Sequence, residues 1–161
     1  MYNGGSRKYS NMRTLGEEYI FVVRGIIANK AGELLLARRS IENSYDVGLW
    51  EFPGGKTNDK PKLSPIEVLE EEIREESGIE ASVGHTALYC HTDRFKDNGS
   101  RKGRVTSFSA GIALSGLAVP DGKEVSEVAW LPPEQVANLE LTPATRAALE
   151  IYTAGRSEIA A

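Results

Sequence analysis

SPIEVLEEEIREESG, residues 64–78, predicts a helix with defined ends. Ser64 is a favoured N-cap, Pro65 suits the first helical turn, and Glu67 completes a capping box with Ser64. Gly78 can take the left-handed conformation in which many helices end. We therefore expect a helix that begins at Pro65 and stops just before Gly78.

This helix should have an apolar face and an acidic face. The apolar stripe consists of Ile66, Leu69 and Ile73. The acidic stripe, at positions i, i+3 and i+4, consists of Glu72, Glu75 and Glu76. Like charges at this spacing repel each other, and a hard divalent cation bound by carboxylate oxygens would offset the repulsion. The alternatives are an acidic face that lies in water, or an interaction surface of an unrelated α+β domain.

The segment before the helix ends in a turn that has almost no side chains. WEFPGGK, residues 50–56, is a short apolar piece stopped by Pro53, Gly54 and Gly55. Two glycines allow the backbone to approach a ligand closely or to adopt a positive φ. A plain Pro-Gly turn is the simpler interpretation, and the motif is informative only together with the acidic helix.

Together, these two segments resemble the Nudix hydrolases, and the MutT-like members in particular. The family pattern is G-x5-E-x7-R-E-U-x-E-E-x-G-U, where U is a bulky apolar residue. Residues 71–79, EEIREESGI, match its second half except at the first position. Residues 34–39 and 124–143 are similar to the second strand and the C-terminal region of the family, so the resemblance covers about residues 19–154. It implies an α/β (α+β) fold, an α/β/α sandwich with a mixed β-sheet.

The resemblance also implies a reaction and its residues. It implies hydrolysis of a diphosphate linkage in a nucleotide derivative, with Mg²⁺ or Mn²⁺ as the cofactor. The implied metal ligands are Glu72, Glu75, Glu76 and the carbonyl of Gly54. The catalytic candidates are Glu72, Glu75 and Glu124, and either Glu72 or Glu124 would be the general base. Within this resemblance, the turn sequence EFPGGK favours nucleoside triphosphates, including oxidised ones, over ADP-ribose as the substrate.

Two positions depart from the family pattern. Glu71 stands where the family has arginine, Leu63 stands where it has the upstream glutamate, and the loop before the helix is two residues longer. The family arginine is thought to orient a catalytic glutamate, whereas Glu71 lies one turn before Glu75 and should repel it. Arg74 should point toward Glu67 and Glu71. Either Glu71 joins the metal site, or catalysis is weakened and the domain binds or senses a nucleotide or nucleotide sugar.

Cations near the turn are candidates for binding phosphate. Arg38 and Arg39 alternate across a strand, so only one of them should face a cleft. Gly55 and Lys56, in the turn itself, complete the set of candidate substrate-binding residues. An ordinary charged strand end would explain the same residues without a substrate.

The remaining chain predicts strands, two further helices and a single domain. Strands are expected over 19–28, 33–38, 49–52, 79–92, 104–114 and 124–131, and helices over 132–139 and 142–154. We expect a flexible lead-in over 1–16, one Nudix-type domain over 17–155 and a short tail over 156–161.

Composition limits the classes of partner and the compartment. The net charge of −4 argues against binding to a nucleic-acid polymer and favours a small nucleotide-like substrate. One cysteine, Cys90, excludes an internal disulfide, and no stretch is apolar for long enough to span a membrane. We expect a soluble cytoplasmic protein, with a homodimer as a candidate assembly.

Overall fold

The computed structural model describes residues 18–43, 45–97 and 99–160. Within these residues, seven strands form one mixed sheet with the order β3-β2-β1-β6-β5, while β4 pairs with β1 and β7 pairs with β2. The strands are β1 (Glu18–Ala28), β2 (Leu34–Arg39), β3 (Trp50–Glu51), β4 (Gly54–Lys56), β5 (Glu80–Asp97), β6 (Ser100–Ser115) and β7 (Val125–Leu131). Only β1 and β6 pair in parallel.

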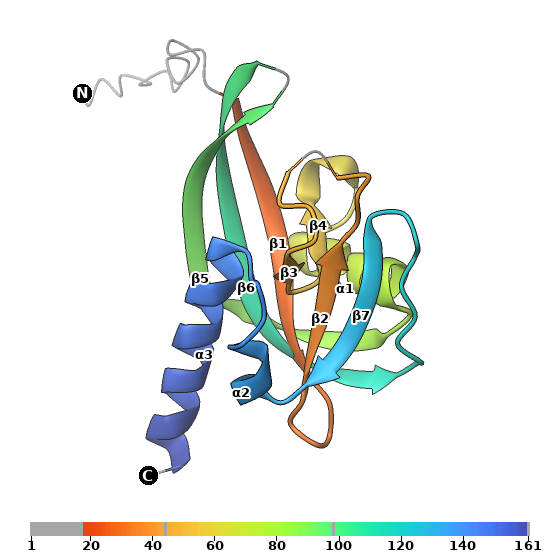
Figure 1. Cartoon of the computed structure of the whole chain (residues 1–161), viewed down its shortest axis with the longest axis vertical. Helices are drawn as coiled ribbons and strands as arrows, with labels where there is room; N and C mark the ends of the chain where they lie inside the picture. The colour runs from red at the N-terminus through yellow and green to blue at the C-terminus, as the bar shows by residue number, and fades with distance from the viewer. Residues whose placement is uncertain (1–17, 44, 98, 161) are drawn as a thin grey trace, which may run out of the picture.

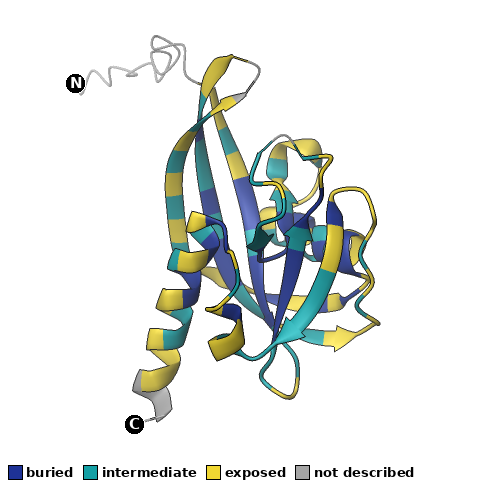
Figure 2. Ribbon diagram, viewed as in Figure 1, coloured by how far each residue is buried: buried dark blue, intermediate teal, exposed yellow. Residues whose placement is uncertain are grey.

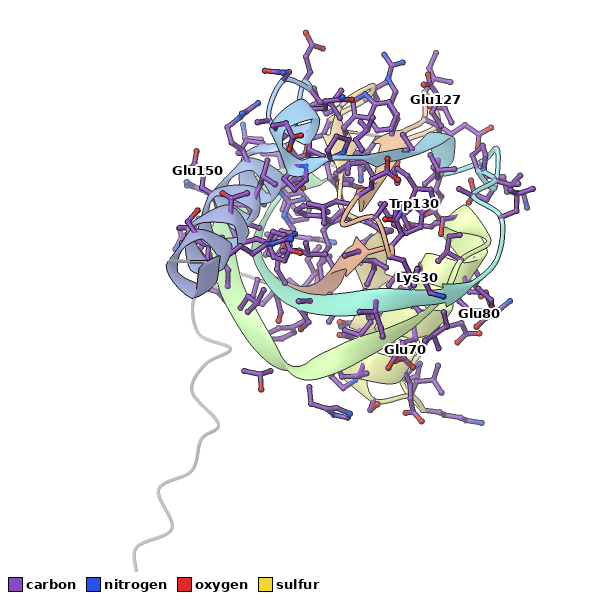
Figure 3. All side chains as sticks on the ribbon, turned by 90° about the horizontal axis from the view of Figure 1, so that it is seen from below. Lys30, Glu70, Glu80, Glu127, Trp130 and Glu150 are labelled. Carbon is purple, nitrogen blue, oxygen red and sulfur yellow. The ribbon has the colours of Figure 1, made fainter. Side chains whose placement is uncertain are left out.

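Helices cover both faces of this sheet (Figure 1). They are α1 (Pro65–Ser77), α2 (Pro133–Val136) and α3 (Pro143–Ala160), and a 3-10 turn spans Thr57–Asp59. Figure 3 shows Glu70 of α1 and Glu150 of α3 at opposite sides of the molecule, with side chains filling the space between. The α/β/α sandwich with a mixed sheet is therefore confirmed.

Strand alternation divides the core in two, with one half on each face of the sheet. Val23, Ile27 and Leu35 pack under α1 with Leu69, Ile73 and other residues. Ile26, Leu34 and Leu36 point the other way and pack with residues of α2 and α3. Figure 2 shows this burial concentrated along β1 and β2. Both faces of the two strands are covered, which explains why their sequences are almost uniformly apolar.

Helix α1 has the predicted ends. The Ser64 hydroxyl accepts a hydrogen bond from the Glu67 amide at 3.3 Å, and the Glu67 carboxylate accepts one from the Ser64 amide at 2.7 Å. Gly78 ends the helix in the left-handed conformation, with φ of 73°. This well-capped helix holds the acidic stripe in a fixed position beside β4.

The PGGK segment is more ordered than the sequence indicated. We expected a turn, but Gly54–Lys56 forms strand β4, in which Gly55 lies opposite Val23 of β1. A Cβ on Gly54 would lie only 1.9 Å from the Val23 carbonyl oxygen. Glycine at position 54 thus allows the segment to pack directly against the middle of β1.

Four other elements differ from their predicted bounds by more than one residue. Strands β5 and β6 continue into residues 93–103, which the sequence left between two predicted strands, because cross-strand pairs such as Asp93 and Arg104 offset the charge of this segment. Helix α2 is shorter than predicted, and α3 continues to Ala160, beyond the predicted end at Ala154 and through most of the expected tail. The lead-in over 1–16 lies outside the described residues. No helix in the described chain is both long and apolar enough to cross a membrane.

Candidate active site

A cleft of about 390 Å³ opens between β1, β4 and α1 on one side and the segments after β2 and before β7 on the other. Its basic side chains are Arg24, Arg39, Lys56 and Arg104. Its acidic side chains are Glu42, Glu51, Asp59, Glu76 and Glu124. Gly54 and Gly55 form part of its wall. The cleft therefore brings together six of the residues that we singled out in the sequence: Arg39, Gly54, Gly55, Lys56, Glu76 and Glu124.

Glu76 is the most enclosed of the three glutamates in the acidic stripe. It is 7% exposed, and its carboxylate accepts a hydrogen bond from the Gly54 amide at 3.1 Å. Burial raises the pKa of Glu76 well above its usual range, although the nearby Arg24 opposes this effect. A buried carboxylate with so few partners holds a proton more readily than an exposed one, and a cation beside it would favour its charged form.

Glu72 and Glu75 share one cation, the ammonium of Lys60. Its Nζ lies 2.9 Å from an oxygen of each carboxylate. Burial raises the pKa of Glu72, and the hydrogen bond from Lys60 only partly opposes this. Desolvation alone would lower the pKa of Lys60, but the hydrogen bonds to Glu75 and Glu72 outweigh it and raise that pKa.

Gly55 makes room for Glu72 in this arrangement. A Cβ at position 55 would lie 2.6 Å from the carboxylate carbon of Glu72. A glycine at position 55 therefore lets the Glu72 carboxylate lie against strand β4, and Glu72 and Glu75 themselves do not line the cleft. This contact gives a steric reason for a glycine at position 55 beside the acidic helix.

Glu71 lies at the edge of the same cluster. One of its oxygens is 3.7 Å from Lys60 Nζ, and the other is 3.7 Å from the guanidinium of Arg74. Arg74 thus points toward Glu71, as the helical spacing predicts, and it also reaches Glu80 at 4.0 Å. The repulsion expected between Glu71 and Glu75 is offset by the cations on either side of Glu71.

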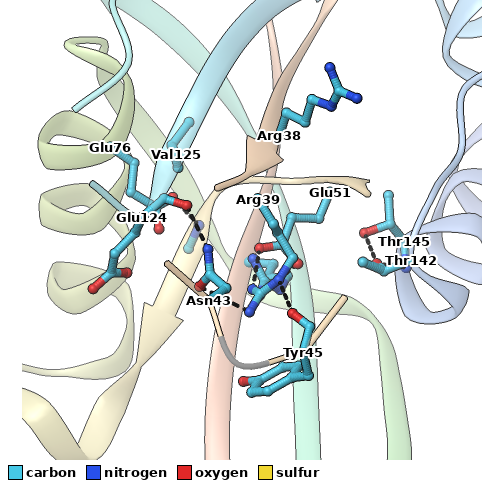
Figure 4. A network of polar contacts seen from close by, with 12 residues as sticks. Arg38, Arg39, Asn43, Tyr45, Glu51, Glu76, Glu124, Val125, Thr142 and Thr145 are labelled. Atoms are coloured by element: carbon cyan, nitrogen blue, oxygen red, sulfur yellow. Dashed lines mark hydrogen bonds and ion pairs between the residues drawn. The ribbon is translucent and has the colours of Figure 1, made fainter. Parts of the chain in front are cut away.

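The two consecutive arginines at the end of β2 separate, as strand alternation predicts. Arg39 is 9% exposed and lines the cleft, where it donates to Glu51 at 2.9 Å and to the Asn43 side chain at 3.1 Å. Arg38 points away from the cleft and pairs with Glu127 at 2.7 Å (Figure 4). Lys56 lines the cleft and is exposed, so its ammonium can meet an incoming anion.

Glu124 is held beside the cleft by its backbone. Its carbonyl accepts hydrogen bonds from the Asn43 side chain and from the Ser40 amide, each at 2.9 Å. The side chain stays free of these bonds, and its charge helps raise the pKa of Glu72. Figure 4 shows Glu124 and Glu76 on the same side of the cleft, at the α1 edge.

Three further residues of the site were not identified from the sequence. Glu51 lies between two arginines, Arg24 at 3.0 Å and Arg39 at 2.9 Å, and these side chains are largely buried. Arg24 interrupts the apolar run that follows Glu18 in β1, EYIFVVRGIIA, and that charge within the run was a usable signal. Lys60 carried no comparable signal, because nothing in a charged loop shows which side chain folds back.

The donor set suits a hard divalent cation. Glu72 and Glu75 already present carboxylate oxygens to one positive charge, and Glu76 lies on the next part of the same helix face. In the part of the chain that the structure describes, no three His, Cys, Asp or Glu side chains converge on one point. The carboxylates would therefore have to close around the ion when it binds.

Comparison with known proteins identifies the family. The NUDIX domain model matches residues 19–152. The chain is 35% identical over 144 residues to the CTP pyrophosphohydrolase of Escherichia coli (strain K12), covering 86% of this chain and 94% of that protein. It is 29% identical over 108 residues to a putative 8-oxo-dGTP diphosphatase of Bacillus subtilis (strain 168), covering 67% of this chain and 63% of that protein.

A solved structure supports the same assignment. The crystal structure of a MutT protein from Methanosarcina mazei Go1 superposes with a TM-score of 0.67 at 27% identity, covering 89% of this chain and 99% of that one. The matched region contains α1, the Gly-Gly strand and the cleft between them. With this sequence match, this fold and this acidic helix, the chain belongs to the Nudix family, among its MutT-like members.

Proposed function

We propose that this protein is a metal-dependent pyrophosphohydrolase that cleaves a diphosphate linkage in a nucleoside triphosphate. One observation carries the proposal: Glu72 and Glu75 converge on a single cation, and the Glu72 carboxylate lies against Gly55, which forms part of the cleft wall. A hydrolase of this kind has to hold positive charge against phosphate oxygens next to a positioned water.

Glu72, Glu75 and Glu76 would hold Mg²⁺ or Mn²⁺, and the Gly54 carbonyl is a candidate fourth ligand. Bound there, the ion would neutralise phosphate oxygens and lower the pKa of a coordinated water. Gly54 already donates its amide to Glu76, so the strand and the carboxylate are in direct contact. These ligand roles are part of the proposal.

The protein's own groups would handle the proton and the phosphate chain. Water attacks a phosphorus atom, the bond from that phosphorus to the bridging oxygen breaks, and the bridging oxygen leaves with the pyrophosphate. Glu72 or Glu124 would accept the proton from the attacking water, because Glu124 lines the cleft and its charge acts on Glu72 of α1. Lys56 would bind the phosphate chain. Arg39 already donates a hydrogen bond to Glu51, so its role would be to hold the side of the cleft that these two residues form.

The substrate class follows from the relatives as much as from the cleft. The names of two relatives, a CTP pyrophosphohydrolase and a putative 8-oxo-dGTP diphosphatase, both specify nucleoside triphosphates. The mixed charge of the cleft suits a ligand with an anionic chain and a polar base. We therefore place nucleoside triphosphates, ordinary and oxidised, before ADP-ribose and nucleotide sugars.

A second candidate function is nucleotide sensing without hydrolysis. Glu71 and Leu63 replace the motif arginine and the upstream glutamate. Lys60 also pairs with Glu72 and Glu75, the carboxylates that the metal would bind. Both features would slow catalysis without preventing nucleotide binding in the cleft.

The test is a hydrolysis panel with Mg²⁺ and with Mn²⁺. Substrates are CTP, the other nucleoside triphosphates, 8-oxo-dGTP, ADP-ribose, a dinucleoside polyphosphate and a nucleotide sugar. Wild type should release pyrophosphate from a triphosphate, and Glu75→Gln should lower kcat by at least about tenfold. Glu150→Gln on α3, which removes the same charge far from the cleft, should behave as wild type. Nucleotide binding by wild type without turnover of any substrate would decide for the sensor.

A further inference from the structure

Lys60 is a loop residue whose ammonium contacts three glutamates of α1. It comes from the loop that is two residues longer than the family pattern, and it folds back onto α1. Its ammonium touches two glutamates at 2.9 Å and a third, Glu71, at 3.7 Å. The side chain is only 21% exposed, so this is a packed position and not a loose surface contact.

The two close partners of Lys60 are the same residues that the proposed function assigns to the metal. An ammonium and a divalent ion cannot both occupy the position between Oε1 of Glu72 and Oε2 of Glu75. Charges of like sign a few ångströms apart in a partly buried site repel strongly. Metal binding therefore requires Lys60 to withdraw from these two carboxylates.

Glu71 provides a place for the displaced ammonium. It lies on α1 one turn before Glu75, within 3.7 Å of Lys60 Nζ, and it is not among the proposed metal ligands. A small side-chain movement is enough to transfer the ammonium to Glu71. An arginine at position 71, as in the family pattern, would repel Lys60 from the cluster instead.

We propose that Lys60 is a tethered counter-cation: it holds Glu72 and Glu75 in the metal-free protein and moves onto Glu71 when a divalent ion binds. The inference rests on the proposed metal-dependent function, because it assumes that the ion uses those carboxylates. The longer loop supplies Lys60, and the glutamate at position 71 accepts it, so the two departures from the family pattern serve the same function. Lys60 is a positioning residue, since it acts on the carboxylates and not on the substrate.

This arrangement has two consequences for the metal. Lys60 balances the charges of Glu72 and Glu75, so α1 does not need a metal ion to stay in place. The ion must also displace a positive charge, so it binds more weakly than it would to the same carboxylates alone. The protein would bind the divalent ion only at higher free-ion concentrations than the same carboxylates would need without Lys60.

The experiment measures metal affinity by titration calorimetry with MgCl₂ and MnCl₂, without nucleotide. Lys60→Met removes the charge and keeps the length of the side chain. Lys60→Arg keeps the charge. Lys62→Met is the matched control, because Lys62 is exposed in the same loop and its loss changes the net charge equally. Lys60→Met should lower the Kd about tenfold, as the loss of a unit charge within ~4 Å predicts, while the other two should stay within about twofold of wild type.

Thermal unfolding tests the metal-free side of the same proposal. In EDTA, Lys60→Met should melt about 2–4 °C below wild type, because the carboxylates lose their counter-charge. Saturating Mg²⁺ should remove that difference. In unsubstituted protein, the NMR signals of the Lys60 Cε methylene should shift on addition of Mg²⁺, and those of Lys62 should not.

The outcomes separate this inference from the proposed function. Metal binding with the same Kd in wild type and Lys60→Met, with no shift at Lys60, would overturn the tethered cation and leave the proposed function standing. The absence of metal binding in wild type, Lys60→Met and Lys62→Met would overturn both. A lower Kd in Lys62→Met, equal to that of Lys60→Met, would reduce the effect to net charge and so overturn the inference.

Discussion

Single residues at this site act through the space that they leave and through their charge. The sequence predicts the steric effects better than it predicts the charge pairs. Gly55 is required because the Glu72 carboxylate occupies the space of its Cβ; the motif indicated that the backbone approaches a ligand or adopts a positive φ, and the structure places a side chain there. Which cation pairs with that carboxylate could not be read from the motif. Lys56, Lys60 and Lys62 lie close together in the sequence, and only the folded chain shows that Lys60 is the one that pairs with that carboxylate.

The pairing of positions 60 and 71 predicts an interdependent pair of substitutions. Glu71→Arg alone adds a cation beside Lys60, and we expect metal affinity and turnover to fall by about tenfold. Glu71→Arg combined with Lys60→Met keeps a single cation at the cluster and should recover most of both. A double-mutant cycle on kcat and on the Kd for Mn²⁺ measures the coupling. Independent effects at the two positions would contradict the pairing, and a strong gain from Glu71→Arg alone would mark an eroded catalytic site.

The adjoining glycines predict two different phenotypes. Gly55→Ala pushes a flexible side chain, Glu72, and should lower kcat by at least about tenfold while the Tm changes by only ~2 °C. Gly54→Ala pushes a backbone carbonyl and should destabilise the fold by about 2 kcal/mol or more. Circular-dichroism melts and kcat from the same preparations distinguish the two. Equal losses of Tm in both variants would show that Gly55 is needed for packing and not for the position of Glu72.

The elements differ in how far local sequence determines them. Helix α1 has a capping box and a glycine stop, so both of its ends were predicted correctly. Strand β4 was missed because its glycines carry no strand propensity, and only the approach to β1 makes it a strand. The β5-β6 hairpin was predicted too short because polar cross-strand pairs, not an apolar pattern, extend it.

One such pair predicts a pH dependence of the hairpin. Hydrogen bonds from Arg104, one of them 2.8 Å long, lower the pKa of Asp93. Because the folded pKa lies below the unfolded value of about 3.9, the ion pair stabilises the fold fully above that pH and stops doing so as the pH falls through the folded pKa. Asp93→Asn should therefore cost on the order of 1 kcal/mol at pH 7 and less at pH 2. Urea unfolding at both pH values tests this, and an equal cost at both would contradict the ion-pair account.

At the scale of the whole molecule, fold and family could be predicted from the sequence, but the state of the site could not. Two strongly patterned segments, the acidic helix and the glycine turn, were enough to indicate the α/β/α sandwich. The cleft depends on residues far apart in sequence, including Arg24, Glu51 and Arg104, whose meeting is a property of the sheet. Arg24 pairs with a glutamate on β3, and no local pattern connects those two strands.

The last prediction concerns the stability of the whole domain. If the acidic face of α1 binds a divalent ion only in the folded state, Mg²⁺ must raise the free energy of unfolding by RT ln(1 + [Mg²⁺]/Kd), about 2.7 kcal/mol at one hundred times the Kd. The Tm of wild type should rise with each addition of MgCl₂. A Glu72→Gln/Glu75→Gln/Glu76→Gln variant should show no rise, and a charge-matched variant with Glu127→Gln, Glu134→Gln and Glu150→Gln should respond like wild type. If both triple variants still respond, the ion binds elsewhere and the acidic face of α1 is not the metal site.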